Sequence, residues 1–370
     1  MPPPSRRVSQ QEIALKAGVH VTTVSLALRD SPRLPAATRE RIRKLAEELG
    51  YQPDPVLSAL VAYRRNAATA RHQGTLAWIN NHTPPSKLYE VAEFREYLEG
   101  AQLRCAELGY KLEEFHTATT SPAQLSRMLH ARNIQGLLFP PQPVGFQNLE
   151  LDWENFSSVA FGFRLKRPAF HRACNAQYRS AKIATETMRA KGYRRIGFAT
   201  VDGNELSADG NFSSGHLAAQ RRFPEKDRVP PIIFDEAAFP PGIDPAPAFQ
   251  REFAAWFKAH RPDAVLSHDP SVPTFFEKLG IDFHACGLAI LTATRTPSRY
   301  AGIYQNDITI GRAAVDFLVG MIHRNERGVP ETPIELLVEG IWVDGPSCPD
   351  RPVERPARRH RAAEPQDTPS

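Results

Sequence analysis

Near the N-terminus, the side chains best placed to contact another molecule are Thr22, Thr23, Ser25 and Leu26. They lie on a short predicted helix, residues 21–28, whose other face is apolar and is expected to point inward. Hydroxyl groups on an exposed helix can bond to phosphate oxygens and to the edges of bases. The chemistry that this helix could do is therefore recognition.

The positive charge of the chain is concentrated at its N-terminal end. Residues 1–72 contain 12 Lys and Arg against 6 Asp and Glu, a net charge of +6, whereas the remainder has a net charge of −1. This asymmetry is typical of a polyanion-binding head on a neutral body. On charge alone, a solvated basic face without a partner remains an open alternative.

Three predicted helices position the exposed residues. Ser9 and Glu12 have the spacing of a capping box and predict a first helix, after which Gly18 permits a sharp turn into the second. The third helix, residues 36–49, has one apolar stripe. Two short helices separated by a glycine turn and followed by a third predict a helix-turn-helix.

Three linked motifs in this region resemble the DNA-binding head of the LacI/GalR-type repressor family. They are IALKAGVHVTTVS at residues 13–25, TRERI at 38–42 and LGYQPD at 49–54. In that family the second helix enters the major groove, where some side chains contact bases and others contact phosphates. The resemblance implies that Val21, Thr22 and Leu26 contact bases. It also implies that the hydroxyl groups of Thr23 and Ser25 contact the DNA backbone and so position the helix. Ser9 and His20 would belong to the same DNA-binding surface.

Two residues depart from the family pattern. His20 stands where the family usually has a capping Ser, and Leu26 replaces a residue that is commonly Arg or another polar side chain. Without an Arg there, a bidentate contact to guanine worth about 1–3 kcal/mol of discrimination is absent. The operator of a better-known relative cannot be transferred to this chain.

Residues 54–73 are predicted to be a hinge helix and linker. Asp54 followed by Pro55 is a good helix start, although the helix is too short to be stable alone in water. The resemblance implies that two hinge helices pair on DNA and insert Leu60 into the minor groove, with Leu57 at a position that usually holds a smaller residue. The alternative is that Leu60 is an ordinary apolar residue of the linker.

The body, residues 74–345, alternates short apolar segments with amphipathic ones, which predicts parallel sheets covered by helices. The expected fold is α/β: a helix-turn-helix head, residues 1–53, and a two-lobed body like the periplasmic binding proteins. The N-lobe is expected at about 74–173 and 302–325, and the C-lobe at about 174–301 and 326–345. Residues 346–370 are rich in Pro and lack an apolar stripe, so a disordered tail is expected.

The cleft between the lobes is the predicted effector site. By position, the residues expected to contact the effector are Asn80, Phe212, Asp269 and Gln305. Phe212 stands where the family usually has a ligand-gripping Arg, and Asn175 where it usually has an Asp. An aromatic ring with few charges suits a sugar-like molecule, whereas Asn80 and Asp269 could also be ordinary turn residues.

Other classes of protein fit the sequence poorly. Nucleophile-elbow, zinc-protease, Walker and dinucleotide-binding motifs are absent, and the four Cys are widely spaced, so no catalytic residue, cofactor or metal is expected. No apolar run is long enough to cross a bilayer and no signal peptide is evident, which predicts a cytoplasmic protein. The predicted function is a homodimeric repressor that binds a pseudo-palindromic operator under effector control; the alternative is an effector-independent DNA-binding dimer.

Overall fold

The computed structural model describes residues 9–28, 34–49, 51, 73–117, 120–143, 146, 149–236, 238–240, 244–295 and 298–352. The chain divides into two compact units, residues 1–71 and 72–370. The boundary falls inside the predicted hinge and linker, residues 54–73, so the first unit contains the predicted head and the second the predicted body. Each unit is considered by itself. The predicted hinge residues Asp54, Leu57 and Leu60 lie outside the described ranges.

The head is a bundle of three helices, α1 (Gln10–Ala17), α2 (Val21–Leu28) and α3 (Ala36–Glu48). The predicted capping box is confirmed: Ser9 Oγ accepts from the Glu12 amide, and the Ser9 amide donates to Glu12 Oε2. Gly18 ends α1 in the left-handed conformation at φ 66°, as the turn requires. The core of the bundle consists of Ile13, Ala14, Ala17, Val24, Ala27, Ile42 and Ala46.

The first lobe of the body is a parallel sheet with helices on both faces. Its strands are β1 (Gly74–Asn80), β2 (Tyr110–His116), β3 (Gly136–Phe139), β4 (Ser157–Phe161), β5 (His171–Asn175) and β11 (Glu335–Val338), in the order β11-β5-β4-β3-β1-β2. Side chains alternate between two cores: Trp78 packs with α5 (Ala92–Leu108) and α12 (Asp307–Arg324), and Ile79 with α6 (Pro122–Ala131). Short 3-10 turns lie at Pro85–Glu90 and Trp153–Asn155.

The second lobe repeats this plan. Its strands are β6 (Ile196–Val201), β7 (Ile232–Phe234), β8 (Ala264–Ser267), β9 (Gly287–Ile290), β10 (Ala301–Tyr304) and β12 (Ile341–Val343), in the order β12-β10-β9-β8-β6-β7. Only the edge strand β12 runs antiparallel among these described strands. The helices are α7 (Gln177–Ala190), α8 (Asp202–Ser207), α9 (Asn211–Gln220), α10 (Ala246–His260) and α11 (Val272–Leu279), with a 3-10 turn at Glu225–Asp227. The predicted α/β class with parallel sheets is confirmed.

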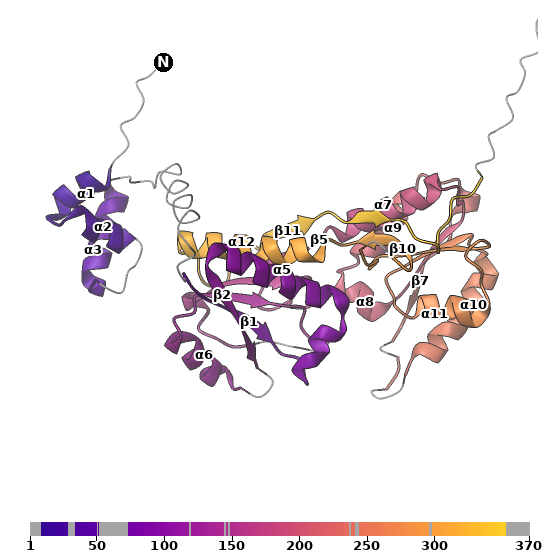
Figure 1. Cartoon of the computed structure of the whole chain (residues 1–370), viewed down its shortest axis with the longest axis horizontal. Helices are drawn as coiled ribbons and strands as arrows, with labels where there is room; N and C mark the ends of the chain where they lie inside the picture. The colour runs from indigo at the N-terminus through magenta and orange to yellow at the C-terminus, as the bar shows by residue number, and fades with distance from the viewer. Residues whose placement is uncertain are drawn as a thin grey trace, which may run out of the picture. The chain divides into compact units, whose positions relative to one another are not determined.

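Helices α5 and α12 lie side by side on one face of the first sheet (Figure 1). Glycines let their backbones approach: a Cβ added to Gly311 would lie 2.2 Å from the Tyr97 carbonyl oxygen, and one added to Gly100 would lie 2.1 Å from the Ile308 carbonyl oxygen. Neither position has room for a side chain. The contact fixes the start of α5, which faces the cleft between the lobes.

The predicted lobe boundaries need correction. Residues 326–345 were assigned to the C-lobe, but β11 pairs with β5 in the first sheet. The segment starting at 302 was assigned to the N-lobe, but β10 pairs with β9 in the second sheet. The chain thus crosses between the lobes three times, after β5, β10 and β11, and each crossing follows the end of a strand. The first crossing falls after Asn175, two residues beyond the predicted boundary.

The expectation of disorder from Pro346 onward is wrong for residues 346–352, whereas residues 353–370 lie outside the described part of the chain. We call residues 345–352 the C-terminal strap. Within it Ser347 and Cys348 are buried, and the Ser347 carbonyl accepts from the Leu288 amide at 2.7 Å. Pairing with β9 and burial of the Cys348 side chain hold the strap on the second lobe despite its Pro-rich composition.

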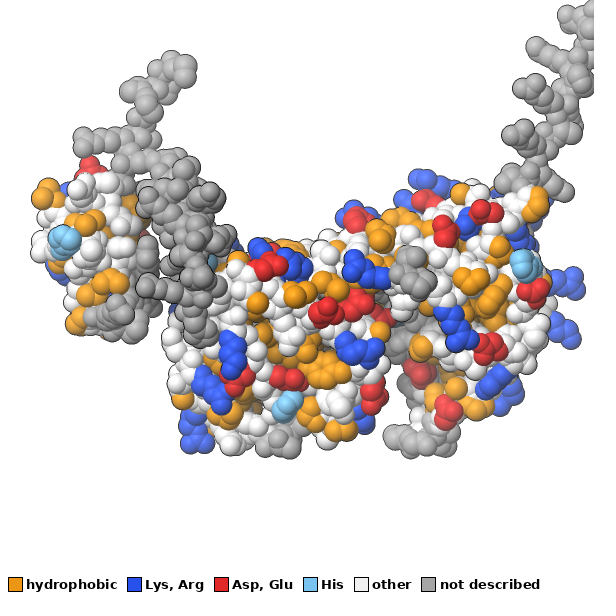
Figure 2. Space-filling model, in the orientation of Figure 1, with side chains coloured by type: hydrophobic (Ala, Val, Ile, Leu, Met, Phe, Trp, Pro, Cys, Tyr) orange, Lys and Arg blue, Asp and Glu red, His pale blue; other side chains and the backbone are white. Residues whose placement is uncertain are grey.

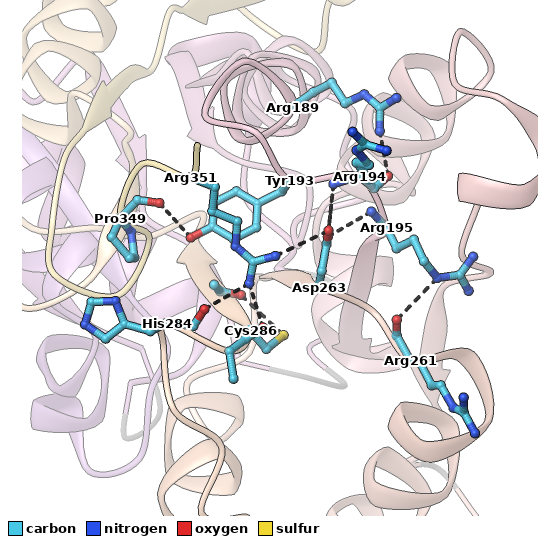
Figure 3. A network of polar contacts seen from close by, with 12 residues as sticks. Arg189, Tyr193, Arg194, Arg195, Arg261, Asp263, His284, Cys286, Pro349 and Arg351 are labelled. Carbon is cyan, nitrogen blue, oxygen red and sulfur yellow. Dashed lines mark hydrogen bonds and ion pairs between the residues drawn. The ribbon is translucent and has the colours of Figure 1, made fainter. Parts of the chain in front are cut away.

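Arg351 fastens the end of the strap (Figure 3). Its guanidinium lies over the Tyr193 ring, 4.4 Å from the centroid, and is 3.5 Å from an Asp263 carboxylate oxygen. It also donates to the carbonyl groups of His284 and Ala285 at 3.1 and 2.6 Å. One side chain therefore ties the strap to three separate segments of the second lobe.

The face of the body shown in Figure 2 carries interspersed acidic and basic side chains, and neither sign forms a continuous patch. This agrees with the near-neutral charge of the chain beyond residue 72. Among the described residues, no helix combines the length and hydropathy needed to cross a bilayer.

Candidate DNA-binding surface and interlobe cleft

Helix α2 presents the face that the sequence predicts. Thr22 is exposed, and Val21, Thr23, Ser25 and Leu26 are partly exposed. The opposite side, with Val24 and Ala27, is fully buried against α1 and α3. The DNA contacts assigned to the exposed residues stay predictions, but their side chains are accessible on one short helix.

His20 caps this helix. Its Nδ1 atom accepts the Thr22 amide at 3.4 Å and is 2.8 Å from Thr22 Oγ1. The His20 carbonyl accepts the amides of Thr23 and Val24 at 2.9 and 3.3 Å. Although the family's usual Ser is missing, the ring nitrogen supplies the acceptor that the first turn of a helix requires. Ser9 serves α1 in the same way, so its hydroxyl is engaged in a cap.

A cavity of about 430 Å³ lies between the two lobes of the body. The first lobe contributes Glu93, Phe94, Tyr97, Phe163 and Arg164 to its lining. The second lobe contributes Asn204, Ser207, His268, Pro270 and Thr292, and Gln305 lines it at the second crossing. Aromatic rings combined with a few polar groups are typical of sites for small polar molecules.

Of the four predicted effector residues, the structure places only Gln305 in the lining. Gln305 Nε2 donates to the Leu291 carbonyl at 2.7 Å. Asn80 is buried outside the lining, where its side-chain amide donates to Pro85 and Glu114. Its candidate role as a ligand contact is not supported by this position.

Phe212 and Asp269 lie behind the lining and support it. The Phe212 ring is buried against the His268 ring, with centroids 4.4 Å apart. Asp269 Oδ2 accepts from the Asn204 side chain at 3.0 Å. Phe212 and Asp269 therefore each contact a neighbour that lines the cavity, His268 and Asn204, and do not line it themselves.

Arg164 is the main lining residue that the sequence interpretation missed. It follows β4, and its Nε donates to Ser207 Oγ at 3.1 Å, so it bridges the two lobes. Its guanidinium lies 5.7 Å from the Phe94 ring centroid and has no carboxylate ion pair among the described residues. Burial lowers the pKa of Arg164. Arg164 could have been predicted as a site residue because it is a basic residue that follows the carboxyl end of an apolar strand, β4 (Ser157–Phe161).

His268 is neutral in this setting. Burial, and after it the positive charge of Arg164, lowers the pKa of His268 to about 4. Its Nδ1 atom is buried and has no hydrogen-bond partner among the described residues. This side of the cavity thus offers a guanidinium, an unpaired imidazole nitrogen and the hydroxyl of Ser207.

Acidic residues gather at the starts of α5 and α12, and one of them, Glu93, lines the cavity. Burial raises the pKa of Glu93. Burial, and then the charges of Glu93 and Glu96, raises the pKa of Asp307 to about 8. Asp307 is 3% exposed, and its Oδ1 atom has no hydrogen-bond partner in the described chain. The Tyr304 hydroxyl donates to Glu96 Oε2 at 2.7 Å, a second contact between the lobes.

Within the described ranges, no cluster of three or more His, Cys, Asp or Glu could hold a metal ion. The four Cys are buried and unpaired. The cleft is therefore equipped to bind a small polar molecule through hydrogen bonds, one guanidinium and aromatic surfaces.

The chain combines a three-helix head that exposes its second helix with a two-lobed α/β body that encloses a cavity. Residues 10–54 match the family described as "Bacterial regulatory proteins, lacI family". The HTH-type transcriptional regulator PtxS of Pseudomonas plecoglossicida is 33% identical over 135 residues, 36% of each chain. The chain thus matches about a third of the length of such curated relatives.

Solved structures extend the likeness of fold to the body. The transcriptional regulator CelR–cellobiose complex has a TM-score of 0.54 at 18% identity, covering 92% of this chain and 100% of that one. The lac repressor dimer bound to operator and the anti-inducer ONPF has a TM-score of 0.51 at 14% identity, covering 93% and 100%. The family match rests on the head, and the likeness of fold to these structures extends over both units. The family and the relatives named here are regulatory proteins.

Proposed function

We propose that this protein is a cytoplasmic transcriptional repressor that binds a pseudo-palindromic DNA operator as a homodimer. The observation that carries the proposal is the lacI-family head, with Thr22 exposed on a capped second helix. The lac repressor of similar fold was solved as a dimer bound to operator, which supports two heads on two half-sites. The excess positive charge of residues 1–72 supplies the attraction to phosphates.

Replacing Thr22 by Ala is expected to relax sequence preference at one position of each half-site by about 1–3 kcal/mol, because a base contact is lost. Binding-site selection followed by fluorescence anisotropy measures the preference and the affinity. Gln11→Ala, an exposed change on α1, is the matched control and should leave the sequence profile unchanged. Identical profiles for Thr22→Ala and the parent would refute the assignment. Affinity that does not fall with salt would refute the phosphate contacts.

We also propose that a small polar, sugar-like molecule in the interlobe cleft modulates operator affinity. The cavity of about 430 Å³ and its mixture of rings and polar groups support this. The solved complex of CelR with cellobiose shows that one regulator of this fold binds a sugar. The alternative, an effector-independent dimer, remains a second candidate because Phe212 and Asn175 replace the charged residues, Arg and Asp, usual in the family.

Arg164→Gln is expected to weaken binding of the effector. The metabolite concentration needed to release or tighten operator binding should rise by about tenfold or more, since a charge-assisted hydrogen bond is worth about 1.5–3 kcal/mol. The Arg164 guanidinium is the natural donor because it lines the cavity and has no ion pair among the described residues. A metabolite screen monitored by operator anisotropy provides the measurement. Lys166→Gln removes an exposed charge from the same loop and should change nothing. If no metabolite alters operator binding of the parent, the effector-independent candidate is favoured.

A further inference from the structure

We propose that His20 sets the hydrogen-bond polarity of Thr22, and thereby which bases α2 prefers. With His20 neutral, Thr22 can only accept a hydrogen bond from a base; with His20 protonated, Thr22 can donate one. The inference rests on the proposed function, because it concerns the residue of α2 that faces DNA. It makes His20 a positioning residue for sequence recognition.

Two contacts to a single atom fix the protonation state. Nδ1 of His20 accepts the Thr22 amide at 3.4 Å and lies 2.8 Å from Thr22 Oγ1. A backbone N–H is always a donor, so Nδ1 must be the unprotonated nitrogen of a neutral ring whose proton is on Nε2. The hydroxyl therefore donates its proton to Nδ1. What remains on Thr22 Oγ1 is a pair of acceptor sites.

The donor and acceptor groups on the base edges of the major groove determine which bases an accepting Thr22 hydroxyl can bind. Cytosine offers only a donor, the N4 amino group, and adenine offers its N6 amino group beside an acceptor; guanine and thymine offer acceptors. A Thr22 that only accepts therefore favours cytosine or adenine. Cytosine against guanine is the clearest comparison, since each presents one polarity to the groove.

Protonation of His20 reverses the arrangement. A proton on Nδ1 removes the acceptor for the Thr22 amide and converts the ring into a donor to Thr22 Oγ1. The hydroxyl proton is then released to donate to guanine or thymine. Imidazole can be protonated by acid that leaves the bases unchanged, so the two states can be compared by changing the pH.

In the described part of the head, the surroundings of the His20 ring hold one hydrogen-bond partner and no charged group in contact with it. Its side chain is exposed, and within residues 9–28, 34–49 and 51 only Thr22, on the helix that it caps, forms a hydrogen bond with the ring. No Asp, Glu, Lys or Arg in these ranges forms an ion pair with it.

The test is binding-site selection with the full chain at pH 8.0 and pH 5.5 and constant ionic strength, followed by anisotropy titrations. The two operators would differ only by C or G at the position that Thr22 contacts. The parent is expected to prefer the C operator at pH 8.0 and to shift its C-to-G affinity ratio toward G by about fivefold or more at pH 5.5. An unchanged ratio would overturn the proposal.

Two variants separate positioning from simple capping. His20→Asn keeps a strong capping acceptor for the Thr22 amide and hydroxyl but does not titrate, so its preference for C should persist at both pH values. Thr22→Val removes the hydroxyl and should show no pH-dependent ratio. A shift in His20→Asn as large as in the parent would overturn the proposal, because another group would then be responsible. If the parent selects no sequence at either pH, the proposed function itself fails.

Discussion

Gly311→Ala is expected to destabilise the body by about 1–3 kcal/mol, although the same change usually stabilises a helix interior. The added Cβ would lie 2.2 Å from the Tyr97 carbonyl and 2.8 Å from the Ala101 amide nitrogen, so backbone rather than a side chain would have to move. The two helices would be forced apart where α5 leads into the cleft. Urea denaturation followed by circular dichroism gives the free energy of unfolding.

Gly320 on the same helix is the matched control. A Cβ there would meet only the end of the Arg324 side chain, at 3.0 Å, which can move aside. Gly320→Ala is therefore expected to stabilise the body by about 0.5–1 kcal/mol through helix propensity. Two variants with the same chemical change on one helix should thus shift in opposite directions. Equal effects would show that the close approach of α5 and α12 is unimportant.

Asp307→Asn is expected to stabilise the protein increasingly as the pH rises from about 4 to 8. Burial first, and then the charges of Glu93 and Glu96, raises the pKa of Asp307 from 3.8 to about 8 in the folded state. The stability contributed by the protonated carboxyl is complete below about pH 3.8 and is lost as the pH rises through about 8. Asn does not titrate, so the variant avoids this loss, which is of the order of 1–3 kcal/mol at pH 8.

Thermal melts between pH 4 and pH 9 measure this difference. Asp316→Asn, on the exposed side of α12 where Asp316 pairs with Arg104, should leave the pH profile close to that of the parent. A constant offset between Asp307→Asn and the parent across the pH range would contradict the raised pKa.

The head could be predicted almost residue by residue. Its caps, its glycine turn and its apolar stripe are local signals, and three short helices leave few alternatives for packing. The apolar strands of the body, such as β3 and β8, were predictable for a similar reason, since four consecutive buried residues bounded by polar segments indicate a parallel sheet. Strands of mixed composition escaped prediction: β5 begins with His171 and Arg172, and β11 is half exposed.

The cleft was harder to predict because its residues come from both lobes and from loops after strands. Of the residues predicted from their position in the sequence, Gln305 lines the cavity. Phe212 and Asp269 lie behind residues that line it. Arg164 has no helix or strand pattern around it and is positioned by Ser207 across the cleft. The prediction of the lobe boundaries was wrong for a related reason. The local sequence of a short strand such as β10 or β11 does not indicate with which of the two sheets it pairs.

The C-terminal strap has a consequence for biosynthesis. The first lobe needs β11 and the second needs β12 and the strap, so neither sheet is complete until residues close to the C-terminal end of the described chain have left the ribosome. The described head helices all end before residue 49 and form a unit of their own, so they can fold much earlier. A chain interrupted during translation would carry a DNA-binding head on an unfinished body. The proposed DNA binding would then be separated from the proposed control by the cleft, which requires the strap that Arg351 holds on the second lobe.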